Sequence, residues 1–183
     1  CIRDSSGTGP KAGGPNYLVR FTHLPAPAAG ARDSVDADLT SLRRALSRSA
    51  DTAEDTRLMP GPTGESNRLD LRARAPVLCL GPGDAARADQ KAAVERLGGS
   101  AVVVSGHLPP DELARINGFS GVLWWGDATE ARAYTKALAA RAGQILPLIT
   151  TEPDAGHVLI ERHLCVDTTA SGGNAALLAD VGE

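Results

Sequence analysis

The stretch that decides the fold is Val77-Leu78-Cys79-Leu80-Gly81-Pro82-Gly83-Asp84-Ala85-Ala86. Four apolar residues run directly into a glycine-containing turn, and a helical pattern follows to about Leu97. A short apolar run that ends at glycine and precedes a helix is typical of a buried parallel strand with its crossover helix. The sequence therefore predicts an α/β fold from this segment outward.

The same alternation of short apolar runs and helical patterns continues along the chain. Strands are expected at residues 77–80, 101–105, 121–125 and 145–150, and helices at residues 85–97, 110–116 and 129–142. Gly98, Gly118 and Gly143 follow these helices, in the position where a left-handed residue commonly ends a helix. Strands that alternate with helices form parallel sheets through right-handed crossovers. We therefore expect a Rossmann-like parallel sheet with crossover helices on both faces.

An amphipathic helix is expected before this region, from residue 36 to about residue 53. Its apolar positions recur at spacings of three and four, at Leu39, Leu42 and Leu46. The run Pro60-Gly61-Pro62 is expected to end that helix. Residues 68–72 then alternate polar with apolar side chains, which predicts a half-buried strand.

Both ends of the chain differ from its middle. Residues 17–21 (YLVRF) are expected to form a strand, and residues 25–31, rich in proline and alanine, an extended linker. Residues 159–166 read as a further strand, and a turn of small residues follows at 168–173. This last segment is unlike the rest of the domain and is expected to be able to leave it.

Composition bounds the class of protein. The chain has 183 residues, 42% of them hydrophobic, which is enough to bury the core of one ordinary domain. A formal net charge of −3 argues against a nucleic-acid-binding segment. The apolar runs are too short for a membrane span, and we expect a cytoplasmic protein. Three widely spaced cysteines indicate free thiols rather than a disulfide framework or a zinc site.

The turn at residues 81–86 matches the G-x-G-x-x-A form of the dinucleotide fingerprint. Pro82 removes one backbone donor, and the second strand ends at residues 104–107 without a carboxylate for a ribose hydroxyl. Asp84 would also place a negative charge beside the pyrophosphate. We therefore expect a tight turn with Asp84 as the helix cap and no bound cofactor. A stand-alone nucleotide-binding protein is the alternative.

Other candidate chemistry is weak. The four histidines lack metal-ligand spacing, and Ser105-Gly106-His107 lacks the elbow of a hydrolase. Cys165 lies in an alternating strand, where a small packed residue is expected rather than a nucleophile. Trp124 and Trp125 point to opposite faces of their strand, so one is expected in the core and the other at a partner contact. No catalytic residue and no metal ligand is predicted.

Three motifs in order resemble one family. Residues 6–17 (SGTGPKAGGPNY) are followed by the YLVRF segment; residues 57–67 (RLMPGPTGESN) precede the first apolar strand; residues 161–175 (ERHLCVDTTASGGNA) lie near the end. All three resemble the C-terminal region of long proline utilization A (PutA) proteins. The resemblance implies that this chain begins just after the catalytic part of their glutamate-semialdehyde dehydrogenase.

The resemblance implies a function for the parent protein rather than for this segment. The parent would oxidise proline with FAD and then oxidise glutamate semialdehyde to glutamate with NAD. In the dehydrogenase a serine and glycines of the first motif anchor the substrate carboxylate, which makes Ser6, Gly7 and Thr8 an incomplete anchor loop here. The nucleophile and base would lie upstream, so we expect this segment to be inactive and to hold neither cofactor.

The remaining residues are assigned a structural role. The Rossmann-like domain, with the fold of an aldehyde-dehydrogenase-superfamily domain, would cover the dehydrogenase and help to seal a substrate-channelling tunnel. The docking motif expected for this role consists of Glu161, Arg162, Val166, Asp167, Thr168, Gly172, Gly173 and Asn174. The expected partner is the dehydrogenase module of the same protein, and a homo-oligomer is a further possibility.

The chain is expected to consist of four units. They are the end of the dehydrogenase module (1–24), a linker with the amphipathic helix (25–60), the Rossmann-like domain (61–160) and the docking motif (161–183).

Overall fold

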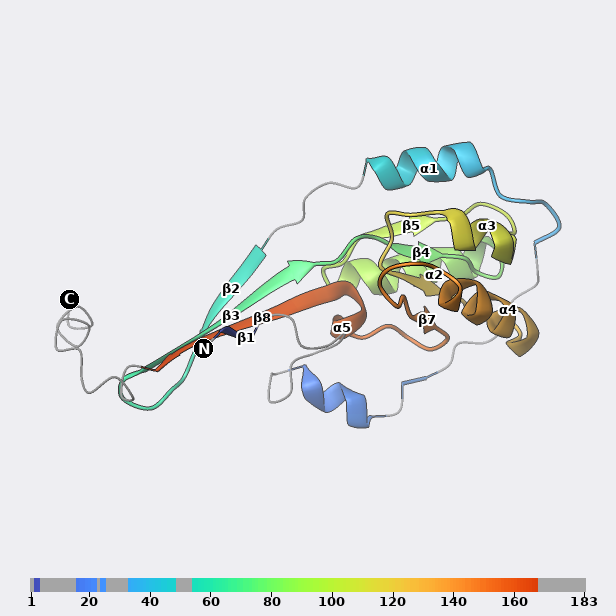
Figure 1. The fold of residues 1–183 in the computed structure, drawn as a ribbon. Coiled ribbons are helices and arrows are strands. Elements are labelled where there is room, and N and C mark those ends of the chain that lie inside the picture. The colour runs from blue at the N-terminus through green and yellow to red at the C-terminus, as the bar shows by residue number, and fades with distance from the viewer. Residues whose placement is uncertain (1, 4–15, 23, 26–32, 49–53, 168–183) are drawn as a thin grey trace.

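The computed structural model describes residues 2–3, 16–22, 24–25, 33–48 and 54–167. Figure 1 shows an α/β body at one end and an antiparallel sheet that extends away from it. The elements of the body are α1 (Leu39–Ser47), β4 (Val77–Cys79), α2 (Gly83–Arg96), β5 (Ala101–Val103), α3 (Pro110–Arg115), β6 (Gly121–Leu123), α4 (Ala128–Ala139), β7 (Leu148–Ile149) and α5 (Ala155–Val158). The extending sheet is formed by β1 (Ile2–Arg3), β2 (Glu54–Met59), β3 (Glu65–Ala73) and β8 (Leu159–Asp167).

The body confirms the predicted α/β class with a parallel sheet. Its strands lie in the order β5-β4-β6-β7, and every neighbouring pair is parallel. All four strands and three helices occur where the alternation of apolar runs placed them, although the strands are shorter. Gly98, Gly118 and Gly143 have φ values of 81°, 92° and 94°, so the expected left-handed residues follow the three helices.

Two apolar clusters cover the two faces of this sheet. One contains side chains of α1, α3 and α4, and the other contains Val94 from α2 and Val158 from α5. Trp124 belongs to the first cluster and Trp125 to the second, as their alternation predicted. The expectation that one of them lines a partner contact was wrong, because helices cover both faces and both rings are buried.

Helix α1 is shorter than predicted. Asp38 caps it, because its carboxylate accepts hydrogen bonds from the N–H groups of Thr40 (2.9 Å) and Ser41 (3.2 Å). Arg48 forms the C-cap, so the helix ends at Ser47. The two buried leucines, Leu42 and Leu46, pack into the first apolar cluster. The helical pattern therefore identified the buried face but not the ends.

The extending sheet is antiparallel, in the order β1-β8-β3-β2. Nine residue pairs join β3 to β8, from Glu65–Asp167 to Ala73–Leu159, which confirms the expected strands at residues 68–72 and 159–166 and lengthens both. Residues 60–62 do not end a helix, because they lie in the connection between β2 and β3 and turn the chain back on itself. The sheet thus joins residues far apart in the sequence.

The predicted strand at residues 17–21 was wrong. Tyr17–Phe21 forms a short 3-10 helix, η1. The rings of Tyr17 and Phe21 meet edge to face, 5.6 Å apart, which a strand would not allow at this spacing. The Thr22 side chain donates a hydrogen bond to the Val19 carbonyl (2.8 Å) and closes the turn. The apolar composition alone did not distinguish these conformations.

The described part of the chain has no membrane-spanning helix, and two of its cysteines are free thiols. Within it, no helix has the length and apolar character needed to cross a membrane. Cys79 and Cys165 are free thiols. Burial raises the pKa of Cys79 to about 12, and burial together with the nearby Glu65 carboxylate raises the pKa of Cys165. Both thiols therefore stay protonated at neutral pH, which agrees with a structural role for Cys165.

Residues 33–37, here called the strap, cross the body before α1 begins. Asp36 forms an isolated parallel bridge with His107. The His107 N–H donates to the Val35 carbonyl and the Ala37 N–H donates to the His107 carbonyl, both at 2.8 Å. Gly106 lies directly beneath the strap with φ = 90°. A side chain at this position would meet the strap backbone, because a Cβ there would lie 2.6 Å from the Val35 carbonyl oxygen.

The contact under the strap predicts different costs for two alanine substitutions. Gly98→Ala carries only the penalty of a left-handed residue, about 1–2 kcal/mol, because nothing lies within 4 Å of its Cβ. Gly106→Ala adds the collision with Val35, and we expect a further loss of about 1–3 kcal/mol. Urea unfolding of both variants measures the difference. Equal losses would mean that the strap does not pack on Gly106.

Candidate functional site

The candidate site lies at the carboxyl end of β4, in the turn Gly81–Gly83. Because β5 and β6 lie on opposite sides of β4, the chain changes direction across the sheet between β4 and β6. Open α/β sheets bind ligands at such switch points. The turn also opens α2, whose first N–H groups attract anions. The topology therefore places the glycine fingerprint where a nucleotide phosphate would be bound.

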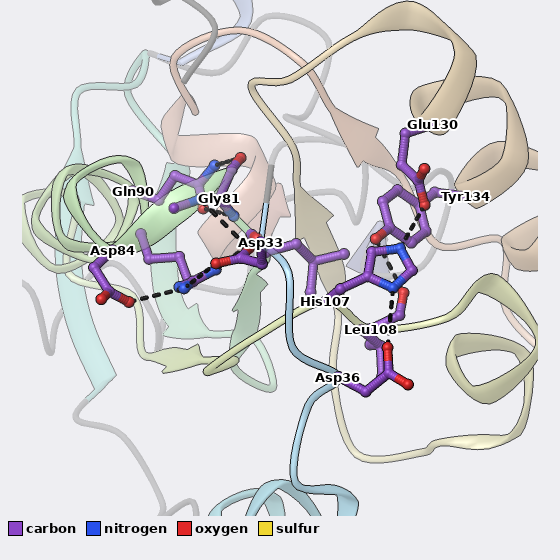
Figure 2. Close-up of polar contacts among 12 residues, drawn as sticks. Asp33, Asp36, Gly81, Asp84, Gln90, His107, Leu108, Glu130 and Tyr134 are labelled. Atoms are coloured by element: carbon purple, nitrogen blue, oxygen red, sulfur yellow. Dashed lines mark hydrogen bonds and ion pairs between the residues drawn. The ribbon is translucent and has the colours of Figure 1, made fainter. Parts of the chain in front are cut away.

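The backbone of this turn is occupied by the chain itself. The Gly81 N–H donates to Gln90 Oε1 (3.0 Å), and Gln90 Nε2 donates back to the Gly81 carbonyl (2.8 Å). The Trp125 N–H also donates to that carbonyl (2.9 Å). Gln90 is fully buried, and Pro82 has no N–H to offer. The turn is therefore held by its own neighbours (Figure 2).

Asp33 from the strap binds at the start of α2. One oxygen, Oδ2, lies 2.6 Å from a terminal nitrogen of Arg87, and Oδ1 lies 2.8 Å from the other. The same Oδ2 accepts a long hydrogen bond from the Gly83 N–H (3.5 Å). The hydrogen bonds from Arg87 lower the pKa of Asp33, despite the opposing effect of burial. Asp33 is thus an ionised carboxylate, bound as a forked pair by Arg87.

Arg87 is the buried charge around which this site is built. Its side chain is 3% exposed, and it also donates to Asp84 Oδ1 at 2.8 Å. The prediction that Asp84 caps α2 was wrong, because the helix begins at Gly83 and Asp84 already lies in its first turn. Pro82 is the N-cap and forms no side-chain cap bond within the described residues. Asp33, far away in the sequence, therefore provides the anion at this helix end.

His107 anchors the other end of the strap. Its Nε2 lies 3.0 Å from Glu130 Oε1 and its Nδ1 lies 3.6 Å from Asp36 Oδ1. Tyr134 donates to the carbonyl of the next residue, Leu108, at 3.0 Å (Figure 2). In the described part of the chain no group of three His, Cys, Asp or Glu side chains has the arrangement of a metal site. The backbone bonds to Val35 and Ala37 and the contact with Asp36 link His107 to the strap.

The predicted site residues are only partly within the described structure. Glu161, Arg162, Val166 and Asp167 of the docking motif lie in β8. Glu161 is buried and accepts a hydrogen bond from the Asn16 side chain. The predicted residues outside the described part are Ser6, Gly7, Thr8, Thr168, Gly172, Gly173 and Asn174. The four docking-motif residues in β8 therefore lie in a strand that pairs with β3. The anchor loop lies outside the described residues.

One face of the extending sheet carries exposed apolar side chains. Leu58 on β2 is 82% exposed, and Ile160 and Val166 on β8 are 41% and 43% exposed. These residues share a face because cross-strand partners point the same way and alternate residues repeat it. Charged residues from the same face lie among them, with arginines at positions 68, 72 and 162 and acidic residues at positions 54 and 70. We call this surface, formed by residues 58, 68, 72, 160, 162 and 166, the sheet face.

Sequence reasoning missed Asp33, Arg87 and Gln90. A signal was present in α2, where the buried positions include Arg87 and Gln90 three residues apart. Polar residues on the buried face of a helix need partners. Asp33, the buried partner of Arg87, lies 54 residues away, so no local pattern could identify it.

The chain is similar to curated PutA proteins. No family model matches it. It is 34% identical to the bifunctional protein PutA of Salmonella typhimurium and 32% identical to that of Escherichia coli, in each case over 94% of this chain. A protein of the same name from Rhizobium meliloti is 32% identical over 97%. The chain spans only 17% of the first two relatives and 18% of the third.

Solved structures of proline utilization A proteins match part of this chain. A crystal structure of a Bradyrhizobium japonicum proline utilization A variant is 26% identical over 52% of this chain and 13% of that one, with a TM-score of 0.39. A TM-score this low does not define a shared fold.

The Asp33–Arg87 pair predicts a specific pH dependence of stability. Because the folded-state pKa of Asp33 is lowered from 3.8, its contribution is complete above that value and is lost as the pH falls through the folded-state pKa. We expect Asp33→Asn to lower the free energy of unfolding by about 2 kcal/mol near neutral pH. The difference from the wild type should shrink below about pH 4.

Urea unfolding of both proteins from pH 7 to pH 3 measures this difference. Asp36→Asn removes another carboxylate from the strap without touching Arg87, and it serves as the control. A wild-type advantage over Asp33→Asn that stays constant down to pH 3 would contradict the assignment of Asp33 as the ionised partner.

Proposed function

Because this chain is a segment of the PutA family, we propose that it is a non-catalytic domain of a bifunctional, cytoplasmic proline catabolic enzyme. The parent would combine an FAD-dependent proline dehydrogenase with an NAD-dependent glutamate-semialdehyde dehydrogenase. In this proposal the segment is an aldehyde-dehydrogenase-superfamily-like domain with a Rossmann-like core. It stabilises the semialdehyde dehydrogenase and helps to seal the tunnel through which the intermediate passes.

The sheet face is the observation that carries this proposal. Leu58 is almost fully exposed on an edge strand, and within the described residues β2 pairs only with β3. Exposed apolar side chains beside a free strand edge favour association with another surface. Figure 1 shows that β2, β3 and β8 extend away from the helices of the body, so a partner can reach them. The dehydrogenase module of the same protein is the partner we propose.

The described part of the docking motif, in β8, is connected to the rest of the domain. The β3–β8 ladder holds residues 159–167 along their whole length, and Arg74 donates to the Leu159 carbonyl (3.1 Å) where the two sheets meet. A second bond at this junction runs from the Arg74 N–H to the Val158 carbonyl (2.8 Å). The sheet face is therefore fixed to the α/β body by the β3–β8 ladder and by Arg74. A fixed surface of this kind is suited to stabilising a neighbouring domain.

The candidate site favours a non-catalytic role over nucleotide binding. The alternative, a stand-alone nucleotide-binding protein, needs open backbone donors at Gly81–Gly83. The Gly81 N–H donates to Gln90 and the Gly83 N–H donates to Asp33. Pro82 has no backbone N–H. The protonated thiols of Cys79 and Cys165 are also poor nucleophiles.

A negative charge on the sheet face should weaken the contact between this segment and the semialdehyde dehydrogenase module. In the parent enzyme we expect Leu58→Asp to weaken docking by about tenfold or more, because an unpaired carboxylate would be buried in the contact. The semialdehyde dehydrogenase rate should fall and a lag should appear in NADH formation from proline, while the flavin-dependent step stays unchanged. Coupled and separate assays of the two steps measure this.

The matched control is Ile145→Asp. Ile145 is 84% exposed, comparable to Leu58, but it lies in the connection between α4 and β7. This variant should leave both steps and the coupling intact. Equal effects of the two substitutions would overturn the sheet face as the docking surface. Removing the residues after Glu161 should impair the same dehydrogenase step, and unchanged coupled kinetics would contradict the proposed role.

A second copy of this chain is the other possible occupant of the sheet face. Light scattering of the 183-residue chain distinguishes the two. A dimer that Leu58→Asp dissociates, with coupling in the parent enzyme unaffected, would favour a homo-oligomer over the dehydrogenase contact.

A further inference from the structure

We propose that Asp33 is a built-in pseudo-ligand: its carboxylate fills an anion-binding site formed by the Arg87 guanidinium and the Gly83 N–H. The ligand class that the site would take is a small phosphate-type anion. The strap, rather than the turn, then decides whether the domain binds such anions. This inference gives a structural cause for the proposed non-catalytic role and rests on it for its biological meaning.

The chemistry of the site is that of anion recognition. A guanidinium holds carboxylates and phosphates with the same two-pronged geometry. Asp33 uses it in that way, with bonds of 2.6 and 2.8 Å to the two terminal nitrogens of Arg87. The same carboxylate faces the N–H of Gly83 at the start of a helix of 14 residues. A phosphate oxygen in this position would meet the same donors.

Burial of Arg87 shows that the site requires an anion. Its side chain is 3% exposed, and its Nε is buried without a hydrogen-bond partner in the described part of the chain. A buried guanidinium that loses its carboxylate is costly unless another anion replaces it. Removing the Asp33 charge should therefore leave a positively charged site at Arg87 that favours binding of another anion.

Asp84 competes for the same guanidinium but does not close the site. Its side chain is 97% exposed, so it can turn into water, whereas the Asp33 side chain is 17% exposed. Asp84 reduces the positive charge available to a ligand while it stays paired with Arg87. We therefore expect anion affinity to increase in two steps, as first Asp33 and then Asp84 loses its carboxylate.

The strap has an independent attachment that keeps the variants folded. Val35 and Ala37 are bonded through their backbones to His107, and neither bond involves Asp33. Helix α1 then continues the chain with Leu42 and Leu46 in the apolar cluster. Loss of the Asp33 carboxylate should therefore free the donors at the turn without releasing the whole segment.

The test is titration of the full 183-residue chain with inorganic phosphate and pyrophosphate. The variants are Asp33→Ser, Asp33→Ser with Asp84→Ser, and Asp33→Ser with Arg87→Gln. Asp36→Ser is the control, because Asp36 lies on the same strap and its side chain is 82% exposed. Calorimetry gives Kd, and circular dichroism confirms the fold. Asp33→Asn replaces Asp33→Ser if the serine variant does not fold.

The proposal expects Asp33→Ser to bind pyrophosphate about tenfold or more tightly than the wild type, the size of one charge-assisted hydrogen-bond pair. The Asp33/Asp84 double variant should bind more tightly still. The Arg87 variant and Asp36→Ser should match the wild type. At ten times Kd, pyrophosphate should raise the Tm of Asp33→Ser by about 3–6 °C.

Two results would overturn the proposal. One is a folded Asp33→Ser or Asp33→Asn chain that binds pyrophosphate no better than the wild type. The other is tighter binding that persists after Arg87→Gln, which would place the anion elsewhere. Neither result depends on a dehydrogenase, so this inference and the proposed docking role can fail separately.

Discussion

A buried guanidinium must be paired, and much of this structure follows from that constraint at Arg87. The pairing fixes Asp33 against the turn after β4, which sets the path of the strap across the carboxyl end of the parallel sheet. The strap leads directly to Asp38, the cap of α1. The electrostatic pairing therefore places Asp33 over the glycine turn, while the backbone bonds to His107 and the burial of Leu42 and Leu46 hold the strap and α1 on the body.

A second constraint governs the extending sheet. β3 and β8 are joined by nine residue pairs, and without this ladder each of the two strands would present one further unpaired edge. This pairing brings residues 159–167 beside the hairpin of β2 and β3 and forms the sheet face. In the described part of the chain, the exposed apolar side chains of this face stay uncovered.

The α/β body and the extending sheet present two different kinds of surface. At the switch point, where such sheets commonly bind a ligand, the chain supplies its own anion and its own hydrogen-bond partners. Away from that point, the antiparallel sheet offers an apolar surface with arginines. A parallel α/β sheet therefore does not by itself specify a ligand site, because function depends on the residues at the site rather than on the fold.

The sequence by itself determined the α/β body, because strands such as Val77–Cys79 and helices such as α2 are encoded by local periodicity and by the glycines that end them. It did not determine η1, because its five residues are compatible with a strand or a 3-10 helix when only local sequence is considered. It also did not determine the hairpin connection at residues 60–62. Only the tertiary structure decided that Asp33 meets Arg87 and that β3 meets β8. These contacts join residues 54 and about 90 positions apart, and their energy depends on burial and pairing that no local window of sequence contains.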